Sequence, residues 1–261
     1  MSGEAKAPMN AAAIQFEDAG FALPDGRRLV SQVNLSADEG ETLVLLGRSG
    51  SGKTTTLKLV NRLLEPTAGQ VRVEQRSTLQ WDPIQLRRRI GYVIQEVGLF
   101  PHYSVAENIG LVPRLEGWPA ARIRQRVDEL LELAGLEAQM AGRYPRQLSG
   151  GQRQRVGVAR ALAADPPILL MDEPFGALDP ITRRALQLEF KALARRLRKT
   201  VVFVTHDLRE ALLLGSRIAL FEAGRVEGVF SPPEFLQSSH ALAREYCAAF
   251  SAAAEPAGAQ S

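Results

Sequence analysis

The chain has 261 residues, enough to bury a large core, and its content of 45% hydrophobic and 23% charged residues is ordinary for a soluble globular protein. The 32 basic and 29 acidic residues leave a formal charge of +3, and clusters such as Arg183-Arg184 are interpreted as solvated helix faces, so no nucleic-acid partner is expected. No apolar run approaches the roughly 18 residues of a membrane-spanning helix, and the single cysteine, Cys247, excludes an intramolecular disulfide.

The N-terminal region carries no targeting signal. Residues 1–11 lack the basic start and apolar core of a signal peptide, so we expect a disordered tail at the start of a cytoplasmic protein. Alternating apolar and polar residues then predict strands at Ile14–Phe16 and Arg28–Leu35, joined as an antiparallel hairpin by the turn residues 24–26. A third strand is predicted at Thr42–Leu46.

A glycine-rich loop follows this third strand and fits the phosphate-loop pattern of Gly, four residues, then Gly-Lys-Ser/Thr. Glycines let the backbone turn tightly so that its N–H groups face a polyphosphate, and the N-terminus of the next helix adds unpaired donors. The lysine is expected to reach the β- and γ-phosphates, and the threonine to bind Mg²⁺. The pattern predicts a nucleoside-triphosphate site made of Gly47, Arg48, Ser49, Gly50, Ser51, Gly52, Lys53, Thr54 and Thr55.

The middle of the chain alternates between strand and helix patterns. After the helix of the phosphate loop, strands are predicted at Gln70–Glu74 and Arg89–Gln95, and a mainly helical stretch runs from Ser104 to about Met140. Later strands are predicted at Ile168–Met171 and Val201–Val204. Such alternation indicates an α/β fold with a mostly parallel sheet, helices on both faces and an inserted helical segment.

The C-terminal part continues the pattern. A helix is predicted to begin with Asp179 as its N-cap and Pro180 in its first turn. Arg217–Glu222 is predicted as the last strand, and a mixed helical region follows at Pro233–Phe250. The final residues, from Ser251, are expected to be disordered.

Two carboxylates follow the buried strand that ends at Met171. They are Asp172 and Glu173, and open α/β sheets bind their ligands at the carboxyl ends of their strands. An aspartate at this position can hold Mg²⁺, and an adjacent glutamate can polarise an attacking water. With the phosphate loop upstream, the pair predicts a hydrolytic site.

A second glycine-containing motif is the segment LSGGQ at residues 148–152. Ser149, Gly150 and Gly151 precede a predicted helix at Gln152–Ala164. The motif therefore offers another helix N-terminus with free N–H donors and little steric bulk.

The motifs stand in one order along the chain: GRSGSGKT, Gln95, LSGGQ, LLMDEP, Ala177-Leu178-Asp179 and His206. In this order the chain resembles the nucleotide-binding subunits of ABC transporters over about residues 12–235. The resemblance implies a P-loop NTPase core with a mostly parallel sheet, an N-terminal antiparallel β subdomain and an inserted α-helical subdomain. It also implies ATP and Mg²⁺ as cofactors, and a homodimer whose subunits pack head to tail.

The resemblance assigns a role to each matching residue. The catalytic set is Glu173, His206, Lys53 and Gln95, with Glu173 acting on water and His206 contacting the γ-phosphate. Mg²⁺ is assigned to Thr54, Gln95 and Asp172. Beyond the phosphate loop, the nucleotide-binding residues are Gln95, Ser149, Gly150, Gly151, Gln152, Asp179 and His206, and the signature of one subunit closes over the nucleotide of the other.

The chain departs from the family at one position. The family usually stacks adenine on an aromatic residue in the N-terminal strand region, where this chain has Leu23, with Phe21 two residues earlier. Side chains alternate along a strand, so Phe21 shares that face but sits one step away. We therefore expect base stacking to be weaker than triphosphate binding.

A finer resemblance points to a transport class. Three segments, Asp82–Gln95, EVGLFPHYSVAENIGLVPRLEGW and Met171–Arg183, resemble ATP-binding subunits of glycine betaine, carnitine and choline importers. The implied partners are a second copy of the chain, integral membrane permease subunits and, indirectly, a solute-binding protein, at the cytoplasmic face of the inner membrane. The alternatives left open are an importer of another small solute, an exporter subunit and a non-transport ABC ATPase.

The expected organisation places an ABC ATPase domain at residues 12–240, with the helical subdomain inserted at about 98–160. Residues 241–261 are expected to hold the end of the C-terminal helix and a disordered tail. Many relatives in this group carry C-terminal CBS domains, and no such domains are expected in the printed sequence, which ends at Ser261.

Overall fold

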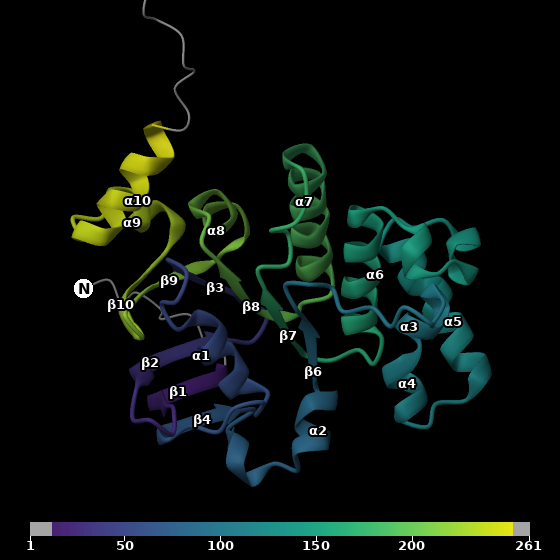
Figure 1. Ribbon diagram of the computed structural model, residues 1–261, viewed down its shortest axis with the longest axis horizontal. Helices are drawn as coiled ribbons and strands as arrows, with labels where there is room; N and C mark the ends of the chain where they lie inside the picture. Colours follow the sequence, from purple (N-terminus) through teal and green to yellow (C-terminus); the bar gives the residue numbers. More distant parts are fainter. Residues whose placement is uncertain (1–11, 253–261) are drawn as a thin grey trace, which may run out of the picture.

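The computed structural model describes residues 12–252, and Figure 1 shows their arrangement. Its larger sheet has six strands within these residues, in the order β10-β9-β3-β8-β7-β6. All neighbours pair in parallel except β10, which is antiparallel to β9. The strands are β3 (Thr42–Gly47), β6 (Ile90–Val93), β7 (Ile168–Asp172), β8 (Thr200–Thr205), β9 (Arg217–Glu222) and β10 (Arg225–Phe230).

A second sheet of four strands is antiparallel and has the order β2-β1-β4-β5. Its strands are β1 (Ala12–Ala22), β2 (Arg28–Asp38), β4 (Ala68–Val73) and β5 (Arg76–Ser77). The predicted N-terminal hairpin is confirmed, with Phe16 opposite Leu35. Both strands run further than predicted. β1 continues past Asp18, whose backbone is left-handed, and β2 continues past Leu35, because Ala37 and Asp38 still pair with β1.

The helices lie on both faces of the larger sheet and in a separate lobe formed by α3, α4, α5 and α6 (Figure 1). The predicted helical stretch after Ser104 is confirmed, although it is divided into short pieces. The helices are α1 (Lys53–Val60), α2 (Pro83–Arg88), α3 (Val105–Ile109), α4 (Leu111–Leu115), α5 (Ala120–Leu133), α6 (Gly150–Leu162), α7 (Pro180–Arg196), α8 (Leu208–Leu214), α9 (Pro232–Gln237) and α10 (Ala241–Ala252), with 3-10 turns η1 (Thr78–Gln80), η2 (Ala138–Gly142) and η3 (Pro145–Gln147).

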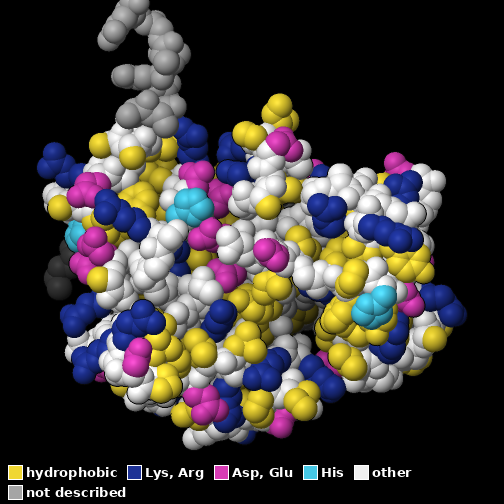
Figure 2. All heavy atoms as spheres, viewed as in Figure 1, with side chains coloured by type: hydrophobic (Ala, Val, Ile, Leu, Met, Phe, Trp, Pro, Cys, Tyr) yellow, Lys and Arg dark blue, Asp and Glu magenta, His cyan; other side chains and the backbone are white. Residues whose placement is uncertain are grey.

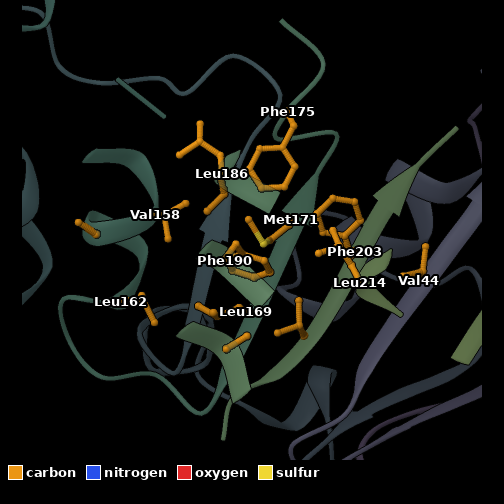
Figure 3. Packing of buried hydrophobic residues seen from close by; sticks show 14 of the residues in the cluster. Val44, Val158, Leu162, Leu169, Met171, Phe175, Leu186, Phe190, Phe203 and Leu214 are labelled. Carbon is orange, nitrogen blue, oxygen red and sulfur yellow. The ribbon is translucent and has the colours of Figure 1, made fainter. Parts of the chain in front are cut away.

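The larger sheet is buried on both faces, which explains its continuous apolar strands. Along β3, Val44 and Leu46 enter one hydrophobic cluster, and Leu43 and Leu45 enter another. Figure 3 shows the first cluster, where the ring of Phe175 packs between α7 and β8. Its centroid lies 5.9 Å from that of Phe203 and 6.3 Å from that of Phe190. The second cluster fills the space between the two sheets.

Several predicted boundaries were wrong. The strand predicted at Arg89–Gln95 is β6 and ends at Val93, so Gln95 lies in the following loop. Arg217–Glu222 is not the last strand, because the chain turns at Ala223 and Gly224, both with positive φ, and returns as β10. That edge strand is six residues long, alternates between exposed and half-buried positions and contains Gly228, so its sequence signal is weak.

The helix predicted at Gln152–Ala164 is α6 and begins at Gly150, so both glycines of LSGGQ lie in its first turn and not before it. The short α2 was not predicted; Asp82 caps it by accepting bonds from the N–H groups of Ile84 and Gln85. The tail predicted from Ser251 begins too early, because α10 continues to Ala252; the predicted tail at residues 1–11 and the rest of the C-terminal one, 253–261, lie outside the described residues. The domain boundaries 12–240 and 98–160 remain predictions.

Candidate nucleotide site

Three neighbouring parallel strands bring the predicted catalytic residues to one edge of the sheet. Leu46 of β3 lies opposite Thr205 of β8, and Val204 lies opposite Asp172 of β7. Because parallel strands end at the same edge, the phosphate loop, Glu173 and His206 all begin where these strands end. The register therefore places these three segments at one edge of the sheet.

The phosphate loop needs glycine at particular positions. Gly50 and Gly52 have φ of +80° and +98°, a region that other residues rarely adopt. At Gly47 the limit is space, because an added Cβ would lie 2.5 Å from the carbonyl oxygen of Phe221 and 2.6 Å from Oγ of Ser51. The loop is therefore packed tightly between β3 and β9.

Replacing Gly47 by alanine is expected to deform the phosphate loop. The backbone of β9 must shift to admit the methyl group, at a cost of about 1–3 kcal/mol in the free energy of unfolding. We expect a lower melting temperature together with weaker ATP binding, measured by thermal unfolding and nucleotide titration. Gly142→Ala is the matched control, because no atom lies within 4 Å of its added Cβ. Unchanged ATP affinity in Gly47→Ala would contradict the tight packing of the loop.

Lys53 closes the phosphate loop on itself. The residue is 4% exposed, and its ammonium donates to the carbonyl oxygens of Gly47 and Arg48 at 2.7 and 2.8 Å, and to Oγ of Ser51 at 3.3 Å. Burial lowers the pKa of Lys53, while the nearby carboxylates of Glu173 and Asp172 oppose that change. A buried cation thus stands among polar acceptors at the centre of the site.

Thr54 and Asp172 meet across the sheet edge. The Thr54 hydroxyl donates to Oδ1 of Asp172 over 2.7 Å, although the residues are 118 positions apart. Burial raises the pKa of Asp172, the bond from Thr54 lowers it, and the charge of Glu173 raises it further. Burial and the neighbouring Asp172 also raise the pKa of the half-buried Tyr92. Hydroxyl and carboxylate oxygens are ligands that Mg²⁺ prefers, so these two residues fit the predicted ion.

Glu173 and His206 form the second pair at this edge. Oε2 of Glu173 lies 3.0 Å from Nδ1 of His206, and the Glu173 side chain is 18% exposed. The backbone of Glu173 has φ of +43°, which is strained for a residue with a side chain, and its N–H donates to the carbonyl of Val204 at 3.1 Å. This turn directs the carboxylate away from β7 and toward the end of β8.

The signature residues and Asp179 lie together in a second group. Ser149 caps α6 in a reciprocal box with Gln152, with bonds of 3.2 and 2.9 Å. A Cβ on Gly151 would lie 2.8 Å from Thr182, in the first turn of α7. Asp179 caps α7 by accepting from the N–H of Thr182 at 3.0 Å, and this bond lowers the pKa of Asp179.

The two groups are separate in one copy of the chain. Figure 1 shows α1 and α6 on different sides of the molecule, with β7 and β8 between them. Gln95 is exposed in the loop after β6, and Thr55 is half-buried in α1. Phe21 packs partly into the cluster between the sheets, which limits its freedom to stack on a base, and Leu23 closes the β1–β2 turn.

Comparison with known proteins agrees with this geometry. A family model described as ABC transporter matches residues 30–176, more than half of the chain. The chain belongs to the ABC transporter family. Among relatives of this family member, the glycine betaine uptake system ATP-binding protein YehX of Escherichia coli (strain K12) is 56% identical over 200 residues, which are 77% of this chain and 65% of that protein.

Two further similarities concern this ABC transporter chain. The glycine betaine/carnitine/choline transport ATP-binding protein OpuCA of Bacillus subtilis (strain 168) is 49% identical over 225 residues, 86% of this chain and 59% of that protein. The chain therefore spans less than two thirds of the length of both relatives. A dimeric, post-hydrolysis structure of the ATP-binding cassette MJ0796 with ADP and Pi is 36% identical, with a TM-score of 0.75 over 84% of this chain and 98% of that one. The predicted family and fold class are confirmed. Within residues 12–252, every helix is too short or too polar to cross a membrane.

Sequence reasoning missed one residue that shapes the site of this family member. Arg183 was interpreted as part of a solvated arginine pair, but it is half-buried and donates to the carbonyl oxygens of Gly176 and Leu178 at 3.1 and 2.9 Å. It thus holds the segment between Glu173 and Asp179. The sequence signal that could have identified Arg183 was its position in the first turn of the predicted helix, close to the preceding loop.

A second missed contact joins the phosphate loop to the C-terminal helix. Arg48 forms an ion pair with Glu245 of α10 at 2.8 Å. Both side chains are largely exposed, so the pair contributes little to stability. No sequence pattern links these positions, which are 197 residues apart.

Proposed function

We propose that this chain is the ATP-hydrolysing subunit of an ABC importer for a quaternary-amine osmoprotectant of the glycine betaine, choline and carnitine class. One observation carries the hydrolytic part: the buried Lys53, the Thr54–Asp172 pair and the Glu173–His206 pair meet at one edge of the sheet. The substrate class is supported by the names of the relatives and by the segments that resemble them.

The residues divide the chemistry of phosphoryl transfer between them. Lys53 and the loop N–H groups hold the β- and γ-phosphates. Thr54 and Asp172 would hold Mg²⁺, which would neutralise charge on the phosphates. Glu173 orients the attacking water and accepts its proton. His206, 3.0 Å from that carboxylate, contacts the γ-phosphate. Gln95 completes the predicted set from the loop after β6.

A second copy of the chain completes the site. The residues of LSGGQ and Asp179 stand apart from the phosphate loop in one chain, so they reach a nucleotide only across a head-to-tail homodimer. The N-terminus of α6, with Ser149 and two glycines, then faces the γ-phosphate of the partner's nucleotide. The structure of a similar ATP-binding cassette as a dimer with ADP and Pi supports the association of two copies.

A groove beside the helical lobe is the docking surface for the permease. It has a volume of about 340 Å³ and lies between β6 and α2 on one side and α4 and α6 on the other, with the exposed Phe100 at its rim. Figure 2 shows hydrophobic side chains gathered beside a hollow in this region. A short cytoplasmic helix of a membrane subunit is the occupant, because the apolar part of the groove takes the apolar face of such a helix, beside the arginines that also line it.

One residue links this groove to the signature helix. Arg160 of α6 donates to the carbonyl oxygens of Val97 and Gly98, each at 2.7 Å, and these residues follow Gln95. Movement of the groove on ATP binding therefore reaches α6 directly. The chain would work at the cytoplasmic face of the inner membrane, bound to permease subunits that receive solute from a separate solute-binding protein.

Uptake of labelled glycine betaine and choline by source cells tests the proposal. A strain that lacks this gene is compared with strains that carry the wild-type gene or the Glu173→Gln gene, at low and high osmolarity. We expect uptake to be lost in the deletion strain and restored only by the wild-type gene. Uptake that persists without the gene, in cells with no redundant carrier, would remove the quaternary-amine assignment and favour an importer of another small solute.

A further inference from the structure

A buried glutamate lies directly beneath the loop that carries His206. Glu210 of α8 is 5% exposed, and each of its carboxylate oxygens accepts one hydrogen bond. Oε2 accepts from the Thr205 hydroxyl at 2.6 Å, and Oε1 accepts from Nε2 of Gln187 at 2.9 Å. Thr205 and Gln187 are themselves 2% and 4% exposed, so the whole cluster is shielded from water.

The cluster brackets His206 on both sides. Thr205 precedes His206 and Asp207 follows it. The hydroxyl oxygen of Thr205 accepts a hydrogen bond from the N–H of Asp207 at 3.0 Å. The bond from Thr205 to Glu210 fixes the orientation of that hydroxyl, so its lone pairs face Asp207. Gln187 belongs to α7, the helix that Asp179 caps, so Glu210 joins three elements of the candidate site.

Burying a carboxylate has a cost that needs an explanation. Burial raises the pKa of Glu210, the bond from Thr205 opposes this, and the charge of Asp207 raises the pKa further. Arg183 and Gln187 also lower it. Packing alone would be served at least as well by an apolar side chain of similar volume. A positioning role explains why a fully bonded acid stands here.

We infer that Glu210 is a positioning residue for ATP hydrolysis, bracing Thr205 and α7 so that His206 stays within 3.0 Å of Glu173. The inference rests on the proposed function. This role depends on the positions of the two carboxylate oxygens as hydrogen-bond acceptors and not on the charge of Glu210. Glu210 itself touches neither nucleotide nor water in this role.

The chain offers matched variants for this distinction. In Glu210→Gln, the new amide can accept from Thr205 and donate to Gln187 after the Gln187 amide flips, so the cluster survives without the charge. In Glu210→Leu, volume is retained and both acceptors are lost. Thr205→Ser keeps the bridging hydroxyl, and Thr205→Val removes it at nearly constant shape.

Steady-state ATP hydrolysis by the purified chain separates positioning from folding. We expect Glu210→Leu and Thr205→Val to lower kcat about tenfold or more, with KM for ATP within about threefold, because a misplaced group affects the chemical step more than binding. Glu210→Gln and Thr205→Ser should keep kcat within about threefold of wild type. Leu131 of α5 is 1% exposed and lies far from this cluster in the sequence. Leu131→Ala should lower the melting temperature without this fall in kcat per folded molecule.

The outcomes are distinguishable. If Glu210→Leu fails to fold, Thr205→Val carries the test alone. A kcat within threefold of wild type in the variants that lack the bridge, or a Glu210→Gln variant as slow as Glu210→Leu, would overturn the positioning role while hydrolysis itself stands. A wild-type chain that hydrolyses ATP no faster than Glu173→Gln would overturn the proposed function and this inference with it.

Discussion

The Glu173→Gln variant is expected to bind ATP as tightly as the wild-type chain and to hydrolyse it about 10²–10⁴-fold more slowly. The amide keeps the size of the carboxylate and can still contact His206, which lies 3.0 Å away, but it cannot accept a proton from water. Lys53 and the Thr54–Asp172 pair are untouched, so the phosphates remain held. Nucleotide titration and phosphate release measure the two quantities separately.

A second glutamine variant controls for the substitution itself. Glu132 lies exposed on α5, so Glu132→Gln should leave both ATP affinity and turnover unchanged. Steady-state hydrolysis at the wild-type rate in Glu173→Gln would contradict the assignment of Glu173 as the catalytic glutamate. Loss of ATP binding in the same variant would show that Glu173 holds the nucleotide instead of activating water.

The Lys53→Ala variant should bind nucleotide much more weakly than the wild-type chain. Lys53 is the buried cation of the phosphate loop. Without it, the carbonyl oxygens of Gly47 and Arg48 lose their hydrogen-bond donor, and the phosphates lose a positive charge that binds them. Charge-assisted bonds to a triphosphate contribute about 1.5–3 kcal/mol each, so we expect affinity to fall about 10²-fold or more. Titration with a fluorescent ATP analogue measures it.

Lys199→Ala provides a matched control for this change. Lys199 is 8% exposed and bonds to Asp165 at 2.7 Å, but it stands just before β8, at the opposite end of the strands from the site. Its loss should lower the melting temperature and leave nucleotide affinity unchanged. Equal affinity loss in both variants would mean that Lys53 acts only through folding.

The part of the site that could be predicted follows from strand ends. The phosphate loop, Asp172-Glu173 and His206 each come directly after a short apolar run, and parallel strands place such residues at one edge. The glycines of the loop were predictable for the same local reason, because a tight phosphate-binding turn needs them. The register of β3, β7 and β8 confirms that grouping.

The remaining features depend on contacts that no local pattern carries. The bond between Gln187 and Glu210 joins two helices, and the bonds of Arg183 lie within a turn whose shape is set by its surroundings. An arginine in a run of charged residues is predicted to be solvated, because the tertiary contacts that bury it are not visible in the local sequence. β10 was missed because it is a short edge strand that contains Gly228 and has no fully buried position, so no buried apolar run marks it.

The start of α6 shows how an error of two residues in a helix boundary changes the chemistry. With Gly150 and Gly151 outside the helix, they would be flexible loop residues. Within the first turn they present free N–H groups at a fixed angle, and Ser149 becomes the cap. Propensity disfavours glycine in helices, so sequence alone placed the boundary two residues late.

Sedimentation velocity of the Glu173→Gln variant with ATP and Mg²⁺ tests most directly whether two copies of the chain enclose the nucleotide. We expect a dimer that persists for as long as ATP is present, while the wild-type chain dimerises and returns to monomer as it converts ATP to ADP and phosphate. A Glu173→Gln chain that remains monomeric with saturating nucleotide would contradict a site built from the phosphate loop of one copy and the LSGGQ segment of the other.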